Sequence, residues 1–263
     1  MCQYNQPYNQ LLETTAQLGY NGIELGGFEY GMLQAKELKY AAESYGLEIV
    51  SAHISCENPV SRLKYLSEAG LSRAVIASAV FADREAVKRF AEQLCKWSDI
   101  FAQNGIGLGY HNHTQEFYVP VGENETLHEM LLQETKHSSV RFQFDAGWAS
   151  CAGIDVVSYL NRYKERFYMM HITESNRVFG AEMPEDFPKD STGKRLVSQS
   201  FKTLQFQKRE ANCRLGQGIN DWPMIIEAGK KQGISIFINE RRHSYTEDLY
   251  MSLAEDVKYL KEI

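Results

Sequence analysis

Long apolar runs are absent from this sequence, because no stretch approaches the ~18 consecutive apolar residues of a membrane-spanning helix. The N-terminal stretch MCQYNQPYNQ is polar and lacks the apolar centre of a signal peptide. These two absences predict a cytoplasmic protein with no membrane partner. A leader trimmed before Met1 stays open as the alternative.

Paired cysteines and basic stretches are also absent. The five cysteines form no C-x-x-C pair, and such a set is typical of reduced thiols rather than of a disulfide framework or a zinc knuckle. There are 28 Lys and Arg against 34 Asp and Glu, so the net charge is −6 at pH 7. Because no Lys/Arg stripe dominates, we expect no nucleic-acid partner. An anionic substrate stays open, since local charge matters more than net charge.

What is present is a regular alternation of apolar runs and helical patterns. The 263 residues suit one α/β barrel domain spanning 1–263. Short apolar runs predict seven strands, and the helical stretches between them predict βαβ units and a parallel sheet. The predicted strands are residues 21–25, 47–55, 72–80, 105–113, 139–147, 166–174 and 233–241.

The predicted fold is a (β/α)8 TIM barrel, which needs one strand more than these seven. Either residues 1–5 form a short stub of the first strand, or that strand is missing. The alternative fold is an open doubly wound sheet. It lacks support, because no predicted strand leads into a Gly-rich phosphate or dinucleotide turn.

One long segment, residues 175–213, interrupts the alternation of strands and helices between the sixth and seventh predicted strands. It mixes charged residues with Pro and Gly, and loops of this length are usually functional or disordered. In a barrel, such a βα loop follows the C-terminal end of a strand, where lids lie. We expect a lid, a dimer arm of a homo-oligomer, or a disordered segment.

Polar side chains end most of the predicted strands, and this is where barrel enzymes carry their active sites. Any single His or Asp there is more often structural, as a hydrogen-bonded residue or a helix cap. Because the strand ends of one barrel converge on its axis, the whole set predicts a shared site. His, Asp and Glu together suit a divalent cation such as Mn²⁺ or Zn²⁺. The residues are Glu24, His53, His111, His113, Asp145, His171, Glu174, Asn239, Glu240 and Arg241.

Seven stretches carry a family resemblance that covers nearly the whole chain. They are LGYNGIEL (18–25), GLEIVSAH (46–53), GYHNHTQEF (109–117), FDAGWASCAGID (144–155), MMHITE (169–174), LGQGINDWPMII (215–226) and INER (238–241). In this order they resemble the sugar phosphate isomerase/epimerase family, whose fold is the xylose isomerase-like TIM barrel. The Y-H-N-H-x-x-E-F and L-G-x-G-x-x-D-W strings resemble one bacterial branch of it.

The resemblance implies one divalent metal ion (Mn, Zn or Mg) held by Glu, Asp, His and Glu from four strands. Asp145, His171 and Glu240 match three of these positions. The fourth position, a Glu in the family, is His111 in this chain. The sequence leaves two candidates for the missing ligand: His111 itself, or Glu116 from the loop that follows.

The same resemblance implies proton abstraction next to a carbonyl, through an enediolate, on a sugar or keto-sugar. In the family's epimerases the replaced Glu is one of two acid/base carboxylates, so Glu240 lacks its partner here and His111 or His113 is the candidate base. We therefore expect a metal-dependent sugar isomerase or epimerase. A 3-keto-glycoside or keto-sugar lyase or hydratase on the same metal site is the first alternative, and a non-catalytic sugar-binding barrel is the second.

The remaining candidates contact substrate. Trp148 follows Asp145 on the loop above the strand, where it either stacks on a sugar ring or packs the fold. Arg241 and Arg242 lie beside Glu240, and we expect them to bind an anionic group or to hold Glu240 by a salt bridge. The other predicted substrate contacts are His53, Glu24 and Glu174. An endonuclease role on this barrel is disfavoured, because the chain is acidic and poor in histidine.

Overall fold

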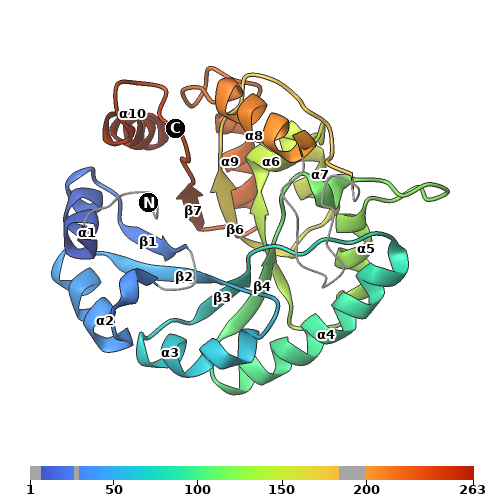
Figure 1. The fold of residues 1–263 in the computed structure, drawn as a ribbon, viewed down its shortest axis with the longest axis horizontal. Helices are drawn as coiled ribbons and strands as arrows, with labels where there is room; N and C mark the ends of the chain where they lie inside the picture. The colour runs from blue at the N-terminus through green and yellow to red at the C-terminus, as the bar shows by residue number, and fades with distance from the viewer. Residues whose placement is uncertain (1–6, 27–29, 184–198) are drawn as a thin grey trace.

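A computed structural model describes residues 7–26, 30–183 and 199–263. Seven parallel strands lie in one sheet in the order β1 to β7, and they curve into a nearly closed barrel with helices outside it (Figure 1). This confirms the predicted TIM barrel, and each predicted apolar run contains one strand. The strands are β1 Gly22–Leu25, β2 Glu48–Ile54, β3 Arg73–Ile76, β4 Gly107–His111, β5 Arg141–Asp145, β6 Phe167–Ile172 and β7 Ile236–Asn239.

Helices fill the connections between the strands, and several begin at residues that the sequence marks as caps. Asp83 caps the longest helix by accepting from the backbone N–H of Ala86. Short 3-10 turns lie at Tyr30–Met32, Pro59–Arg62 and Gln115–Phe117. The helices are α1 Tyr8–Gln17, α2 Ala35–Ser44, α3 Leu63–Glu68, α4 Arg84–Gln103, α5 Leu127–Glu134, α6 Ala146–Cys151, α7 Val156–Arg162, α8 Gln199–Ala211, α9 Trp222–Lys231 and α10 Leu249–Glu262.

The barrel is open between β7 and β1, since no strand within the described ranges pairs with the free edge of either. Residues 1–5, the predicted stub of a first strand, lie outside the described residues. Side chains link the two sides instead: Asn239 Nδ2 donates to Tyr20 Oη at 2.7 Å, and Tyr20 Oη donates to the Leu253 carbonyl of α10 at 3.1 Å.

Strand register brings the candidate residues to one end of the barrel. Asp145 pairs with His171 across β5 and β6, and His171 pairs with Ile238 across β6 and β7. Phe142 and Phe144 on β5 are fully buried, and Phe144 packs on Phe167 with ring centroids 4.8 Å apart. Because both faces of these strands are packed, the side chains at their C-terminal ends are held in place.

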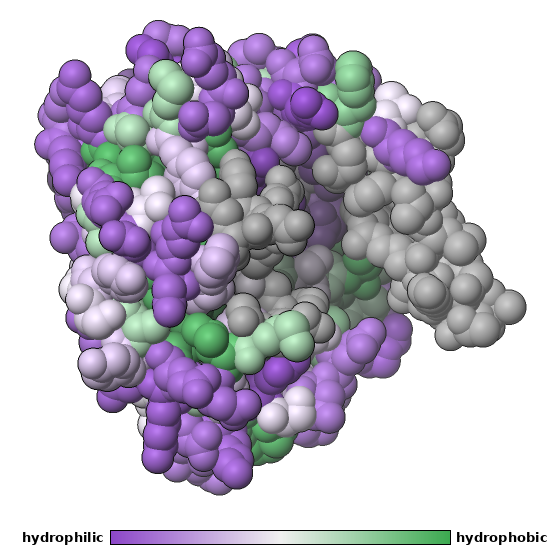
Figure 2. Space-filling view, turned by 60° about the vertical axis from the view of Figure 1, so that its left-hand side comes forward, coloured by the Kyte–Doolittle hydropathy of each residue, from purple (hydrophilic) through white to green (hydrophobic). Residues whose placement is uncertain are grey.

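The long segment between β6 and β7 returns to the barrel at its far end. Ser175 and Asn212 form an antiparallel bridge that brings its two ends together. The prediction of a lid or dimer arm for residues 175–213 falls partly on 184–198, which lie outside the described residues, and it stays a prediction. Within the described ranges no helix is both long and apolar enough to cross a membrane. Figure 2 shows a mainly hydrophilic face with hydrophobic residues in small groups.

Candidate metal and substrate site

Four ligand-type side chains from consecutive strands meet at the C-terminal end of the barrel. His111 ends β4, Asp145 ends β5, His171 lies on β6 and Glu240 follows β7. One ligand atom from each lies within 4.8 Å of the others. His171 Nδ1 lies 3.1 Å from Glu240 Oε2 and 3.9 Å from Asp145 Oδ2. We call these four residues the ligand cluster.

The ligand cluster contains buried polar atoms with no hydrogen-bond partner among the described residues. They are both ring nitrogens of His111 and Oδ2 of Asp145. Buried polar groups are nearly always hydrogen-bonded, so orphaned atoms gathered at one point indicate a missing partner. Nitrogen and oxygen ligands from imidazoles and carboxylates are the set that Mn²⁺ or Zn²⁺ binds. The residues present therefore fit a divalent cation.

Charges within the cluster also favour a bound cation. Burial raises the pKa of Asp145 to about 7, although His171 opposes this. Burial disfavours the charged form of His171, but Glu24 and Glu240 raise its pKa to about 10. The carboxylates around His171 thus favour positive charge at this largely buried site. A divalent cation supplies that charge where the cluster otherwise holds a proton.

Glu24 forms a buried support beneath His171. Its Oε1 lies 2.6 Å from His171 Nε2 and 3.1 Å from His53 Nε2. Gln143 Nε2 donates to Glu24 Oε2 at 2.6 Å, and the Ser51 hydroxyl also donates to that oxygen. Burial disfavours the Glu24 carboxylate, but His53 and His171 hold its pKa well below the usual value. Glu24 and His53, both predicted to contact substrate, thus lie against His171: Glu24 through the 2.6 Å contact and His53 by ring stacking, with centroids 5.5 Å apart.

Glu116, the alternative ligand, lies in a separate packed environment. Its Oε1 accepts from Tyr110 Oη at 2.6 Å and its Oε2 accepts from the backbone N–H of His113 at 2.8 Å. Burial raises its pKa to about 7. Among the described residues, the groups whose atoms converge closely enough for a metal include His111 and leave Glu116 out.

A cavity opens beside the ligand cluster, and its lining includes His113, Trp148, Thr173, Lys208, Glu240 and Arg242. His113 Nδ1 is buried and has no hydrogen-bond partner among the described residues. Burial, followed by the charge of Arg242, lowers the pKa of His113 to about 3. A neutral imidazole at this place can accept a proton from a bound molecule.

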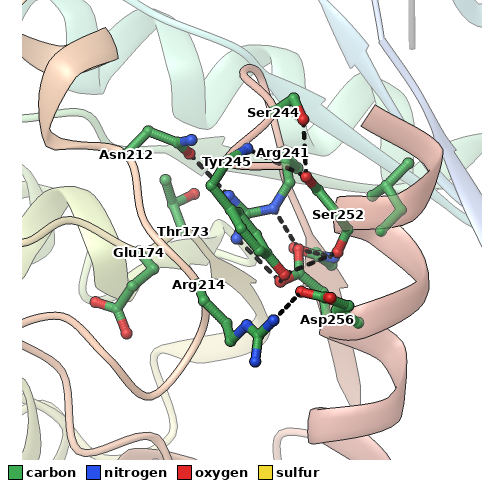
Figure 3. A network of polar contacts seen from close by, with 12 residues as sticks. Thr173, Glu174, Asn212, Arg214, Arg241, Ser244, Tyr245, Ser252 and Asp256 are labelled. Carbon is green, nitrogen blue, oxygen red and sulfur yellow. Dashed lines mark hydrogen bonds and ion pairs between the residues drawn. The ribbon is translucent and has the colours of Figure 1, made fainter. Parts of the chain in front are cut away.

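Of the two arginines after β7, Arg242 contacts the ligand cluster. Arg242 Nε donates to Glu240 Oε1 at 2.7 Å, which leaves Oε2 toward His171. Arg241 is directed toward α10 instead (Figure 3). It forms an ion pair with Asp256 through two nitrogens, and its Nη1 donates to Asn212 Oδ1 at 2.7 Å. Arg241 therefore links the end of β7 to α10 and to Asn212, the residue that follows α8.

Glu174 is buried, and both of its carboxylate oxygens are engaged. They accept from the backbone N–H of Ser175 and of Gly216, both at 3.1 Å, and from Asn220 Nδ2 at 2.7 Å and Trp222 Nε1 at 2.8 Å. Although Glu174 lines the cavity, three of these four bonds come from residues 216, 220 and 222, so Glu174 holds the LGQGINDW turn.

Lys208 is a charged cavity residue that the sequence did not predict. It lies on α8, and its Nζ lies 4.4 Å from the centroid of the Trp148 ring and 3.3 Å from Glu182 Oε2. Nothing local in the sequence distinguishes it from the other basic residues of the helix. Only the return of the long segment to the barrel places it in the cavity.

Known proteins share this architecture. The family model of the xylose isomerase-like TIM barrel matches residues 12–263. No curated protein matches the sequence. A solved sugar phosphate isomerase/epimerase from Parabacteroides distasonis ATCC 8503 has a TM-score of 0.76 and 19% identity, over 99% of this chain and 93% of that chain.

Two further solved structures are similar over nearly the full length. A 3-keto-D-glucoside 4-epimerase from E. coli has a TM-score of 0.71 and 14% identity, covering 100% of this chain and 97% of that chain. A probable 3-DHS dehydratase from Bacillus anthracis has a TM-score of 0.68 and 14% identity, covering 98% of this chain and 95% of that chain. At these identities the likeness to solved structures shows a shared fold alone.

Proposed function

The chain belongs to the xylose isomerase-like TIM barrel family, and we propose that it is a metal-dependent sugar isomerase or epimerase that moves a proton next to a carbonyl. The observation that carries the proposal is the ligand cluster: His111 and Asp145 present buried atoms without partners among the described residues, beside His171 and Glu240. Similar structures include sugar epimerases and a dehydratase, and abstraction of a proton next to a carbonyl is a step that both epimerisation and elimination can use.

Asp145, His171, Glu240 and His111 are the residues that would hold one divalent ion. When bound, a divalent cation polarises carbonyl and hydroxyl oxygens and stabilises negative charge that develops on them. Glu24 supports this assignment, because it contacts His171 Nε2 at 2.6 Å and so leaves Nδ1 toward Asp145 and Glu240. Carboxylates that fix a ligating His in this way are the usual outer support of metal sites.

His113 and Glu240 are the residues that would move the proton. Glu240 keeps a low pKa despite burial, because Arg242 and His171 stabilise its charge. His113 is neutral in its buried position, since its pKa is lowered to about 3. Each group is therefore unprotonated near neutral pH, which is the form that a general base needs.

Elimination from a 3-keto-glycoside is a second candidate for the same site. It is favoured by one observation: Glu240 is the single carboxylate of the cluster that also lines the cavity, and an imidazole, His113, lines the same cavity. An imidazole beside a carboxylate is an asymmetric acid/base pair, suited to removing a proton on one side and protonating a leaving group on the other.

The test is proton exchange in D₂O. The protein is incubated with Mn²⁺ and a set of keto-sugars and 3-keto-glycosides, and deuterium at the carbon next to the carbonyl is followed by NMR. We expect exchange with the wild type and a loss of roughly 10²-fold or more in Glu240→Gln, with exposed Glu13→Gln as the matched control. A new sugar as product indicates isomerisation, and release of the aglycone indicates elimination. Absence of exchange with every substrate would contradict both.

A further inference from the structure

Three side chains with donor-only nitrogens lie together in the cavity wall. Lys208 Nζ lies 4.4 Å from the centroid of the Trp148 ring, and the guanidinium carbon of Arg242 lies 5.8 Å from it. Trp148 is 7% exposed and the Lys208 side chain is 10% exposed. An ammonium, a guanidinium and an indole N–H all donate hydrogen bonds and accept none.

These donors have capacity that the described residues do not use. Lys208 Nζ carries three hydrogens and donates one hydrogen bond within the described ranges, to Glu182 Oε2 at 3.3 Å. Arg242 uses Nε for Glu240, and its two terminal nitrogens form no hydrogen bond in the part of the chain that is described. Trp148 Nε1 is buried and equally without a described partner.

The carboxylates in the same wall are largely engaged. The oxygens of Glu174 accept from Gly216 and Trp222 in the turn that it holds. Oε2 of Glu182 accepts from the Thr114 hydroxyl as well as from Lys208, while its Oε1 has no hydrogen bond among the described residues. Glu240 faces the ligand cluster and Arg242. Within the described ranges, the hydrogens of Lys208, Arg242 and Trp148 that form no hydrogen bond thus outnumber the free carboxylate oxygens of this wall.

We propose that the substrate is a keto-sugar that carries an anionic oxygen group, a carboxylate or a phosphate, bound by Lys208 and Arg242 beside the Trp148 ring. A sugar hydroxyl both donates and accepts, so it matches this wall less well than an anion, whose oxygens only accept. Charge-assisted hydrogen bonds from Lys and Arg are also the stronger ones. The proposal rests on the proposed function, since it assigns the substrate class of that site.

The experiment compares matched ligands by calorimetric titration of the Mn²⁺-loaded protein. The pairs are D-glucuronate against D-glucose, for a carboxylate, and D-fructose 6-phosphate against D-fructose, for a phosphate. We expect one or both anions to bind at least roughly tenfold more tightly than the neutral partner. The pair that shows the preference identifies the anion. Equal affinities within both pairs, or no binding of either anion, would overturn the proposal.

Substitutions test which side chains cause the preference for the anion over the neutral sugar. Lys208→Gln and Arg242→Gln are each expected to reduce the ratio of anion affinity to neutral-sugar affinity by roughly tenfold. Because Arg242 also contacts Glu240, this ratio, and not the anion affinity alone, is the readout. Lys202→Gln and Arg209→Gln, at exposed positions on α8, are the matched controls. Because Lys208→Gln leaves Glu182 without its cation, the Lys208→Gln/Glu182→Gln variant checks that the loss comes from the cation, and thermal unfolding of each variant checks the fold.

A preference for the anion that survives both Lys208→Gln and Arg242→Gln contradicts the assignment. Exchange in D₂O with no anion preference would overturn the anion site alone, whereas absent exchange would overturn the proposed function.

Discussion

Glu24 Oε1 lies 2.6 Å from His171 Nε2, with both side chains almost fully buried. This contact fixes which nitrogen of His171 faces Asp145 and Glu240. We expect Glu24→Gln to weaken Mn²⁺ binding by roughly 10- to 100-fold, because the neutral amide orients the ring less firmly and lowers its basicity. Titration of chelator-treated protein measures this, with exposed Glu13→Gln as control. An unchanged Mn²⁺ affinity would show that Glu24 supports only the fold.

Substitution of His111 should mainly affect metal binding, whereas substitution of His113 should mainly affect proton exchange. We expect His111→Asn to lower Mn²⁺ affinity by roughly 10²-fold, since a ligand is lost. We expect His113→Asn to leave Mn²⁺ affinity within about twofold and to slow proton exchange by roughly 10²- to 10⁴-fold. Parallel metal titration and NMR exchange on both variants test the split. The reverse pattern would exchange the two roles.

Burial of the Glu116 carboxyl should make the protein less stable as the pH rises. Its pKa rises from 4.5 in the unfolded chain to about 7 when folded, so burying its charge costs about 3 kcal/mol above pH 7. As pH falls through this window the folded protein binds a proton that the unfolded chain does not, and the cost disappears. The difference in the free energy of unfolding between Glu116→Gln and the wild type should therefore favour the variant more at pH 8 than at pH 5.

Urea unfolding of both chelator-treated proteins at these two pH values gives the comparison. The same variant should keep its Mn²⁺ affinity, because Glu116 is bonded to Tyr110 and His113 and stays out of the ligand cluster. A large loss of Mn²⁺ affinity would instead make Glu116 the fourth ligand.

Gly147 lies where α6 approaches β6 most closely. A Cβ at this position would lie 2.0 Å from the Thr173 carbonyl oxygen. Gly147→Ala must push α6 away from the barrel, and we expect a loss of about 1 to 3 kcal/mol in the free energy of unfolding. Because Asp145 caps α6, Mn²⁺ affinity should fall as well. Gly107→Ala is the matched control, since its nearest neighbour would be 3.7 Å away. Equal stability of the two variants would contradict this packing.

Much of the fold was predictable because it rests on local patterns. Apolar runs bounded by polar residues located all seven strands of the described sheet, and the register of a parallel barrel then forces Asp145 and His171 together. His111 joins the same cluster because it ends the neighbouring strand β4. These placements need only strand periodicity and the geometry of one fold.

The remaining features depend on side-chain direction and on long-range packing. Sequence could not choose between Arg241 and Arg242, because the choice follows from Asp256 on α10, which draws Arg241 away. Lys208 was missed, since its place depends on how α8 returns to the barrel. The contact of Glu24 with His171 was likewise not predicted, because it joins side chains 147 positions apart in the chain, and the predicted contact of Glu24 with substrate stays a prediction.

The central claim is that the ligand cluster holds one divalent ion. Mn²⁺ titration of chelator-treated wild type and of the Asp145→Asn/His171→Asn variant tests it. Circular dichroism confirms that the variant folds, and the amide introduced by Asp145→Asn keeps a side-chain oxygen for the cap of α6. The predicted result is one Mn²⁺ per wild-type chain and a roughly 10²-fold or greater loss of affinity in the variant. Equal Mn²⁺ binding by both proteins would contradict the site.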